Sequence, residues 1–245
     1  MEKKELIDGL FITSDYCVWY EPKKTIILSD FHLGFEASLK DEGVSLPRYQ
    51  KDEILNRLST IIDKYEPRTM IVNGDFKHEF GRNRREEFYE VVDVIDYILD
   101  NCNLGVVRGN HDNFLKNITE KKNVPFYETP LHLNNLVLVH GHKEIDEDRF
   151  LIIGHEHPSI KIRDDMGALV KLSCFMYDKK NKILILPAFS PLAEGRDMIN
   201  SEDFISEAIK GLAIADFHVY ALTDEGLMDF QTVKDVRNAY PEWRK

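Results

Sequence analysis

Five short segments of this 245-residue chain share one pattern, in which an apolar run ends in Asp, Asn or His. In the last segment, residues 152–159, His155 and His157 lie two positions apart directly after such a run. Alternate side chains of an extended segment point to the same side, so one loop can offer two nitrogen ligands to one place. Packing alone does not explain five strand ends of this kind. The other four segments are 26–32, 70–75, 106–112 and 136–142.

The residue types at these segment ends suit hydrolysis of a phosphate ester. Attack on a phosphodiester needs a nucleophile that exists near neutral pH and positive charge beside the phosphoryl oxygens. Two cations about 3.5–4 Å apart supply both, because they convert a shared water to hydroxide near pH 7 and hold the attacking and leaving oxygens. Seven side chains give each metal four ligands if one carboxylate bridges them: Asp30, His32, Asp75, Asn110, His140, His155 and His157.

The chemistry of the donors narrows the choice of metal. Imidazole, carboxylate and amide ligands without thiolate suit Mn²⁺, Fe²⁺ or Zn²⁺. Cys17, Cys102 and Cys174 are odd in number and form no C-x-x-C pair. The sequence therefore predicts neither a disulfide framework nor a thiolate zinc site, and we expect each cysteine to be a small buried residue.

The elements that must position these residues alternate in the first half of the chain. Residues 47–65 and 83–100 carry apolar residues at helical spacing, and apolar strands are expected at 25–29, 69–73 and 104–107. Strands that alternate with helices pair in parallel, and ligand sites form at their carboxyl ends.

From residue 126 onward the pattern changes to short strands. We expect strands at 136–139, 149–153, 159–163, 168–177 and 182–186, one helix at 201–210, and strands at 217–223 and 227–232. Residues 10–12 and 17–20 are expected as strands before the first motif. The predicted fold is α/β, a sandwich of two β-sheets flanked by helices, with the metal site at the carboxyl ends of the strands.

The length and composition favour one domain over residues 1–245. No apolar run approaches the roughly 20 residues of a membrane span, and the start Met-Glu-Lys-Lys-Glu lacks the apolar core of a signal peptide. We therefore expect a cytoplasmic protein that does not associate with a membrane. The net charge of −11 disfavours general wrapping of a polyanion but allows a phosphate at a local positive site.

Taken together, the motifs resemble the signature of the calcineurin-like metallophosphoesterases, complete and in order. They are Asp30-x-His32, Gly74-Asp75-x-x-His78, Gly109-Asn110-His111-Asp112, His140-Gly141-His142 and Gly154-His155-x-His157. Residues 28–36, the Gly154–Pro158 turn and residues 186–189 further resemble a prokaryotic SbcD-related subgroup, which includes the bacterial ligase-associated metallophosphoesterases. The similarity covers residues 25–195 as a motif core and leaves residues 196–245 as a C-terminal extension without predicted chemistry.

The resemblance implies a role for each ligand. Asp75 is the expected bridge between two divalent ions, of which Mn²⁺ is the first choice and Fe, Zn or Ni the alternatives. One metal is expected on Asp30, His32 and His157, and the other on Asn110, His140 and His155.

Next to a ligand but outside the set, His111 is expected by resemblance to donate a proton to the leaving-group oxygen. Asp112 is then expected to orient or charge His111, or alternatively to cap the helix that follows the loop.

Two further groups of residues have open roles. His78 and His142 serve either in supporting hydrogen bonds and loop packing or in substrate contact. The arginine cluster is either a solvated helix face or a grip for flanking phosphates; it comprises Arg82, Arg84 and Arg85.

The expected function is hydrolysis of phosphodiesters by a metal-activated hydroxide, on nucleic-acid ends or nucleotides. The chain has no room for a large capping domain after the last histidine motif, so processive DNA degradation is not expected. The alternatives are a small-molecule phosphomonoesterase, a cyclic-nucleotide phosphodiesterase, or a scaffold of the same fold that binds a protein partner without catalysis. Whether the protein forms a homo-oligomer stays open.

Overall fold

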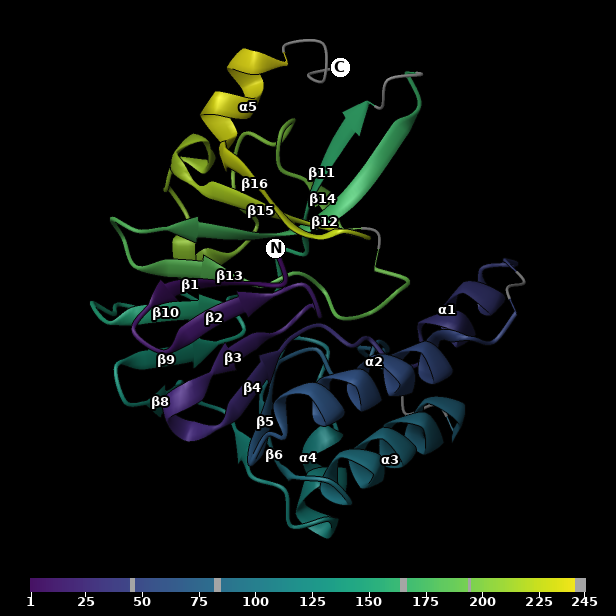
Figure 1. Cartoon of the computed structure of the whole chain (residues 1–245). Helices are drawn as coiled ribbons and strands as arrows, with labels where there is room; N and C mark the ends of the chain where they lie inside the picture. The colour runs from purple at the N-terminus through teal and green to yellow at the C-terminus, as the bar shows by residue number, and fades with distance from the viewer. Residues whose placement is uncertain (45–46, 82–84, 164–166, 194, 241–245) are drawn as a thin grey trace.

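Two β-sheets packed face to face form the centre of the protein (Figure 1). The computed structural model describes residues 1–44, 47–81, 85–163, 167–193 and 195–240. The first sheet has seven strands in sequence order: β1 (Lys3–Ile7), β2 (Leu10–Thr13), β3 (Val18–Tyr20), β4 (Thr25–Leu28), β5 (Thr69–Asn73), β6 (Asn103–Val107) and β7 (Phe126–Tyr127). Strands β1 to β4 are antiparallel, and β4 to β7 are parallel, as the strand and helix alternation predicted.

The second sheet contains nine strands and begins at β8 in sequence. Strands β9, β10 and β13 pair in parallel at its centre, and β15 and β16 extend it beside β12. Its members are β8 (Leu131–Leu133), β9 (Leu136–Val139), β10 (Phe150–Ile153), β11 (Pro158–Arg163), β12 (Leu169–Asp178), β13 (Ile183–Ile185), β14 (Arg196–Asp197), β15 (His218–Thr223) and β16 (Gly226–Thr232).

Both faces of the parallel strands are covered, which explains why these strands are apolar along their whole length. In β4, Ile26 and Leu28 pack against the helices, whereas Ile27 faces the second sheet. This alternation follows from the two-residue period of a strand. One apolar core therefore lies between the sheets and a second lies under the helices.

Helices α2 and α3 cover the outer face of the first sheet (Figure 1). On α2, Ile54, Leu58 and Ile61 are buried at helical spacing, and the helix ends where Glu66 adopts a left-handed conformation before Pro67. The helices are α1 (Phe35–Asp41), α2 (Gln50–Tyr65), α3 (Arg85–Leu99), α4 (Leu115–Lys121) and α5 (Val233–Ala239). None of the helices described is both long and apolar enough to cross a membrane.

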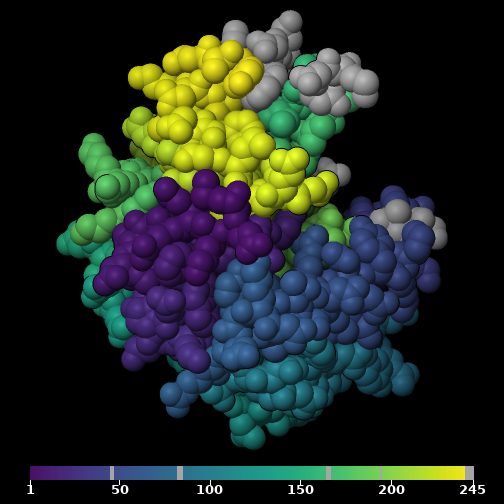
Figure 2. Space-filling model, in the orientation of Figure 1, coloured from purple at the N-terminus to yellow at the C-terminus, as the bar shows by residue number. Residues whose placement is uncertain are grey.

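Residues 196–240, the C-terminal segment, pack in part on the outer face of the second sheet. The segment also contacts the N-terminus of the chain. Figure 2 shows this segment (yellow) against the N-terminal strands (purple), where the Met1 and Leu227 backbones exchange two hydrogen bonds of 3.0 and 2.7 Å. The helix expected at 201–210 is wrong, because only a short 3₁₀ turn, η2 (Glu207–Ile209), forms there. Instead, the Ser206 hydroxyl donates to the carbonyl of Gly141, so a tertiary contact sets the local conformation.

Phe31 anchors the first metal-motif loop in the core. It is fully buried, and its ring stacks on Phe76 and Phe189 at centroid distances of 5.2 and 4.8 Å. We predict that Phe31→Ala lowers the free energy of unfolding by about 3–5 kcal/mol, because the substitution leaves a cavity that rigid neighbours cannot fill. Urea denaturation measures the loss. Phe88→Ala, at a side chain that is 39% exposed, is the matched control; equal losses in the two variants would contradict the packing argument.

Candidate metal centre

The five motif loops meet at one edge of the sandwich, where β4, β5 and β6 of the first sheet and β9 and β10 of the second sheet end. Asn73, the last residue of β5, joins the two sheets at this point. Its side-chain amide donates to the carbonyls of Val139 and Ile152 at 2.8 and 3.2 Å. Loops that are far apart in sequence therefore converge, as the carboxyl ends of parallel strands should.

Asp30, His32 and His157 form the first donor group, and their ligand atoms lie within 4.8 Å of one another. The Nε2 atom of His157 lies 2.9 Å from Asp30 Oδ1 and 3.1 Å from His32 Nε2. Asp30 is fully buried, and the backbone amide of His155 donates to its carboxylate. Two imidazole nitrogens and a carboxylate oxygen thus face a common point.

Asp75, His140 and His155 form the second donor group with the same mutual spacing. The Nε2 atom of His140 lies 3.1 Å from both Asp75 Oδ2 and Asn110 Oδ1. The same Asp75 oxygen is 3.7 Å from His32 Nε2 in the first group. Asp75 therefore lies beside donors of both groups, which is the position that a bridging carboxylate requires.

The backbone around these donors is strained. Five of the seven expected ligands have positive φ angles of 44–67°, a region that costs L-residues free energy and that is common at functional sites: Asp30, His32, Asp75, His155 and His157. Gly109 allows its loop to pass close to Asp75, because a Cβ atom there would lie 2.1 Å from Asp75 Oδ1.

Burial and opposite charge set the protonation of the cluster. Burial disfavours the charged form of Asp30, but the positive charges of His157 and His140 and the hydrogen bond with His157 together outweigh burial and lower the Asp30 pKa to about 2. Burial likewise opposes protonation of His140, yet Asp75 and Asp30 raise the pKa of His140 to about 9. Burial, together with the charge on His157, lowers the pKa of His32 to about 3. The two buried carboxylates thus draw positive charge into the site.

His111 lies at the side of this cluster and is partly exposed. Its backbone amide donates to Asp75 Oδ1 at 2.9 Å, and its Nδ1 pairs with the backbone carbonyl of His78. Because the carbonyl can only accept, Nδ1 carries the proton, and Nε2 is turned to within 4.0 Å of Asp75 Oδ2.

The Asp112 carboxylate contacts backbone amides rather than a helix N-terminus or the His111 ring. Asp112 is buried, and its carboxylate accepts hydrogen bonds from the backbone amides of Asp75, Phe76, Lys77 and Gly109. Helix α4 begins at Leu115 without a side-chain cap, so the capping alternative is wrong. Within the described residues no hydrogen bond joins the Asp112 carboxylate to the His111 imidazole. Asp112 instead fixes the Asp75 loop to the loop that carries Asn110 and His111.

The other two histidines of the motifs lie next to donors. The ring of His78 stacks on Phe35 at a centroid distance of 4.1 Å, and its Nδ1 is 3.3 Å from Nδ1 of His32. The ring of His142 lies 5.5 Å from that of His140. Both positions suit support of a ligand, and neither excludes contact with a substrate.

Of the three arginines in the cluster, the structure describes only Arg85. Arg82 and Arg84 lie outside the described residues. Arg85 is exposed at the first residue of α3, where its guanidinium lies 5.7 Å from the centroid of the Tyr89 ring. Arg85 is not among the described residues that line the cavity over the donors.

A sequence model of the calcineurin-like phosphoesterases matches residues 23–224 of the chain. The chain belongs to this family. Its members use divalent metal ions and act on phosphate esters, which makes this protein a phosphoesterase by family. The match extends past residue 195, into the extension to which the sequence assigned no chemistry.

A solved structure supports the same fold. The chain is similar to the nuclease MPE of Pseudomonas putida, with a TM-score of 0.69 and 18% identity over 93% of this chain and 98% of that one. It is also similar to Yfce, a phosphoesterase from E. coli, with a TM-score of 0.39 and 16% identity over 85% of this chain and 98% of that one. No curated protein matches the chain.

The cavity over the donors, about 490 Å³, is partly walled by the C-terminal segment, to which the sequence assigned no chemistry. Gly195, Arg196 and Ile205 line it. Arg196 pairs at 3.1 Å with Glu156, which is 1% exposed and also accepts from the backbone amide of Ser206. A glutamate between two site histidines needs such a partner when it is buried, so Glu156 was the sequence signal for this contact.

The donor set fits the divalent metals of the family. Two buried carboxylates and four imidazoles converge with the Asn110 amide oxygen, and no thiol joins them, since Cys17 and Cys174 are buried in the apolar cores. The close approach of the His32 and His157 Nε2 atoms, 3.1 Å, directs two imidazole nitrogens at one point. A shared cation satisfies both without a proton between them.

We predict that Asp112→Asn destabilises the centre although the side chain keeps its size. Each carboxylate oxygen accepts two amide hydrogens, and the asparagine NH₂ would face two of those donors. Since a buried donor without an acceptor costs about 1–3 kcal/mol, the free energy of unfolding should fall by at least about 2 kcal/mol.

Chemical denaturation measures the change, and Asp148→Asn at an exposed position is the matched control. An Asp112→Asn variant as stable as this control would show that the four hydrogen bonds do not hold the loops.

Proposed function

We propose that the protein is a dinuclear metal-dependent phosphodiesterase that acts on nucleic-acid ends or nucleotides. In this proposal Asp75 bridges two divalent ions, with Mn²⁺ as the preferred metal. Asp30, His32 and His157 complete one site. The other site is completed by Asn110, His140 and His155.

One observation carries the proposal: of three donor groups, the third being His32, His78 and His111, the two that contain a carboxylate meet at Asp75. The Asp75 Oδ2 atom lies 3.7 Å from His32 Nε2 and 3.1 Å from His140 Nε2. Each of these two groups holds a carboxylate and two imidazoles within 4.8 Å. A structural cluster needs no such duplication, whereas a pair of metals that share one carboxylate does.

The metal ions, His111 and Asp112 have different roles in the proposed hydrolysis. When bound, the two ions supply a nucleophile from water near neutral pH and neutralise charge on the phosphoryl oxygens. His111, held at Nδ1 by the His78 carbonyl, presents Nε2 to the leaving-group oxygen and donates a proton there when it is charged. The Asp112 carboxylate accepts hydrogen bonds from the backbone amides of Asp75 and Gly109, and it thereby fixes the loop that carries His111 relative to the Asp75 loop.

Two observations support phosphodiesters of nucleic acid or nucleotides as the substrates. The motifs resemble the SbcD-related subgroup, and the structural neighbour from Pseudomonas putida is named a nuclease. The net charge of −11 places the attraction for phosphate at the metal site rather than over the general surface. A single domain over residues 1–245 and a cytoplasmic location stay predictions from the sequence.

Turnover of two aryl esters tests the proposal. We expect the Mn²⁺-loaded protein to hydrolyse bis-p-nitrophenyl phosphate with a higher kcat/KM than p-nitrophenyl phosphate. A preference for the monoester would reject the phosphodiesterase and favour the alternative, a phosphomonoesterase. Absence of turnover of either ester with Mn²⁺, Fe²⁺, Zn²⁺ or Ni²⁺ would reject the enzyme and favour the scaffold.

We predict that Asn110→Ala weakens one metal site and spares the other, because the amide belongs only to the His140 group. Elemental analysis after gel filtration should find about two Mn per wild-type chain and about one per variant chain. Asn56→Ala, on the exposed face of α2, is the matched control and should retain both ions. Loss of both ions from Asn110→Ala would refute the division of ligands.

We predict that His111→Ala keeps both metals and slows hydrolysis of esters with poor leaving groups by about 10²–10⁴-fold, since the variant lacks the proton donor. The loss should be smaller for p-nitrophenyl esters, whose leaving group departs without a proton. His132→Ala, outside the motifs and exposed, serves as control. A metal-free His111→Ala variant would make His111 a ligand and overturn its assigned role.

A further inference from the structure

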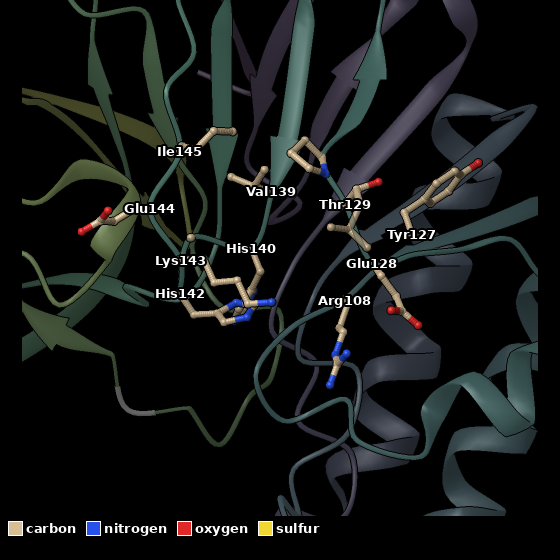
Figure 3. A pocket seen from close by; sticks show the side chains of 13 residues that line it. Arg108, Tyr127, Glu128, Thr129, Val139, His140, His142, Lys143, Glu144 and Ile145 are labelled. Atoms are coloured by element: carbon tan, nitrogen blue, oxygen red, sulfur yellow. The ribbon is translucent and has the colours of Figure 1, made fainter.

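A second pocket lies beside His140, which also belongs to the second donor group of the candidate metal centre (Figure 3). It lies between the ends of β6, β7 and β9 and measures about 110 Å³. At about 10–15 Å³ for each water-sized group, this is room for roughly seven to eleven such groups, the size of a single-ring nucleobase. Its wall is mostly apolar, with Val107, Tyr127, Val139 and Ile145 as contributors.

The rim of this pocket carries positive charge. Arg108 and Lys143 line it, and within the described residues Lys143 forms no ion pair, while the Arg108 guanidinium donates one hydrogen bond, to Asn113. Of the acidic neighbours, Glu128 is paired with Lys116 at 2.9 Å, and the side chain of Glu144 points away from the histidines in Figure 3. Cationic donors are therefore available to an anion.

His142 adds an independent sign of a missing partner. It lines the pocket beside His140, and its Nδ1 atom is buried without a hydrogen-bond partner among the described residues. A buried polar atom without a partner is costly and needs an explanation. A polar ligand in the pocket would satisfy this atom if the His142 ring turned toward it.

We propose that this pocket binds the nucleoside part of a nucleotide phosphodiester, with a single-ring base against the apolar wall and the phosphate directed to the metal centre. An apolar slot with a few converging polar groups is the usual form of a small-molecule site. His140 belongs to both the pocket and the donor cluster, so a ligand in the pocket reaches the metals directly. This inference rests on the proposed function of the metal centre.

The position of His111 decides which part of the substrate enters. His111 packs on His32 and His78, with ring centroids at 5.1 and 5.6 Å, away from the pocket that His140 and His142 line. In the proposed mechanism the leaving group lies on the side of His111, because His111 donates the proton to it. The pocket therefore receives the nucleoside that stays on phosphorus, and the product is a nucleoside monophosphate.

Two substrates with the same leaving group test this inference. They are the p-nitrophenyl ester of thymidine 5′-monophosphate and methyl p-nitrophenyl phosphate, which differ only in the retained group. With the Mn²⁺-loaded protein we expect kcat/KM to favour the thymidine ester by about tenfold or more. Thr129→Trp, which fills the pocket from an exposed position, and Lys143→Met should reduce this ratio to within about twofold of one.

The controls separate the pocket from general effects. Thr129→Ala leaves the pocket open and should keep the wild-type ratio, and Lys180→Met, at a remote exposed turn, should change neither substrate. Thermal melting checks that each variant folds. A ratio that is unchanged in Thr129→Trp and Lys143→Met would overturn the inference while leaving the phosphodiesterase intact.

If the wild-type protein hydrolyses neither ester, the proposed function fails and direct binding decides the pocket. Isothermal titration calorimetry should then detect thymidine 5′-monophosphate binding to the wild type and its loss in Thr129→Trp, with inorganic phosphate as the comparison ligand. Equal affinities for thymidine 5′-monophosphate in these two proteins would reject the pocket as a nucleoside site.

Discussion

Two buried carboxylates, Asp30 and Asp75, set the main physical constraint on this protein. Both are almost completely buried at the joint between the two sheets, where an uncompensated negative charge is strongly unfavourable. The surrounding imidazoles and backbone amides compensate this negative charge in part. The two carboxylates raise the pKa of His140 to about 9, which shows that the site favours positive charge. In the proposed function, a pair of divalent cations would compensate the same negative charge and would supply the chemistry of the site.

The loops that bring these groups together are held by buried polar side chains. Asn73 ties the end of β5 to β9 and β10 of the other sheet. Asp112 fastens the Asp75 loop to the following motif, and Glu156 joins the His155 loop to Arg196 and Ser206 in the C-terminal segment. The strained backbone at the donors persists because these contacts determine it from several directions. The metal centre is thus built by the whole chain, including the part that follows the last motif.

Much of this arrangement follows from the sequence because it depends on local periodicity. The buried strands β4, β5 and β6 and the amphipathic helices α2 and α3 repeat their apolar residues at the expected spacing, and parallel strands bring their carboxyl ends together. The remainder depends on contacts between distant segments. Residues 201–210 look helical in isolation, yet the Ser206 bond to Gly141 sets their path. The four amides around Asp112 come from two loops, and no local pattern reveals them. Helix α5 was missed despite a local signal, the reciprocal hydrogen bonds of Thr232 and Asp235.

The central claim is that one carboxylate, Asp75, is shared by two cations. Anomalous X-ray diffraction from crystals grown with Mn²⁺ tests it most directly. The account predicts two anomalous peaks about 3.5–4 Å apart, both within bonding distance of the Asp75 carboxylate. A single peak, or two peaks with Asp75 bound to neither or to only one of them, would contradict it.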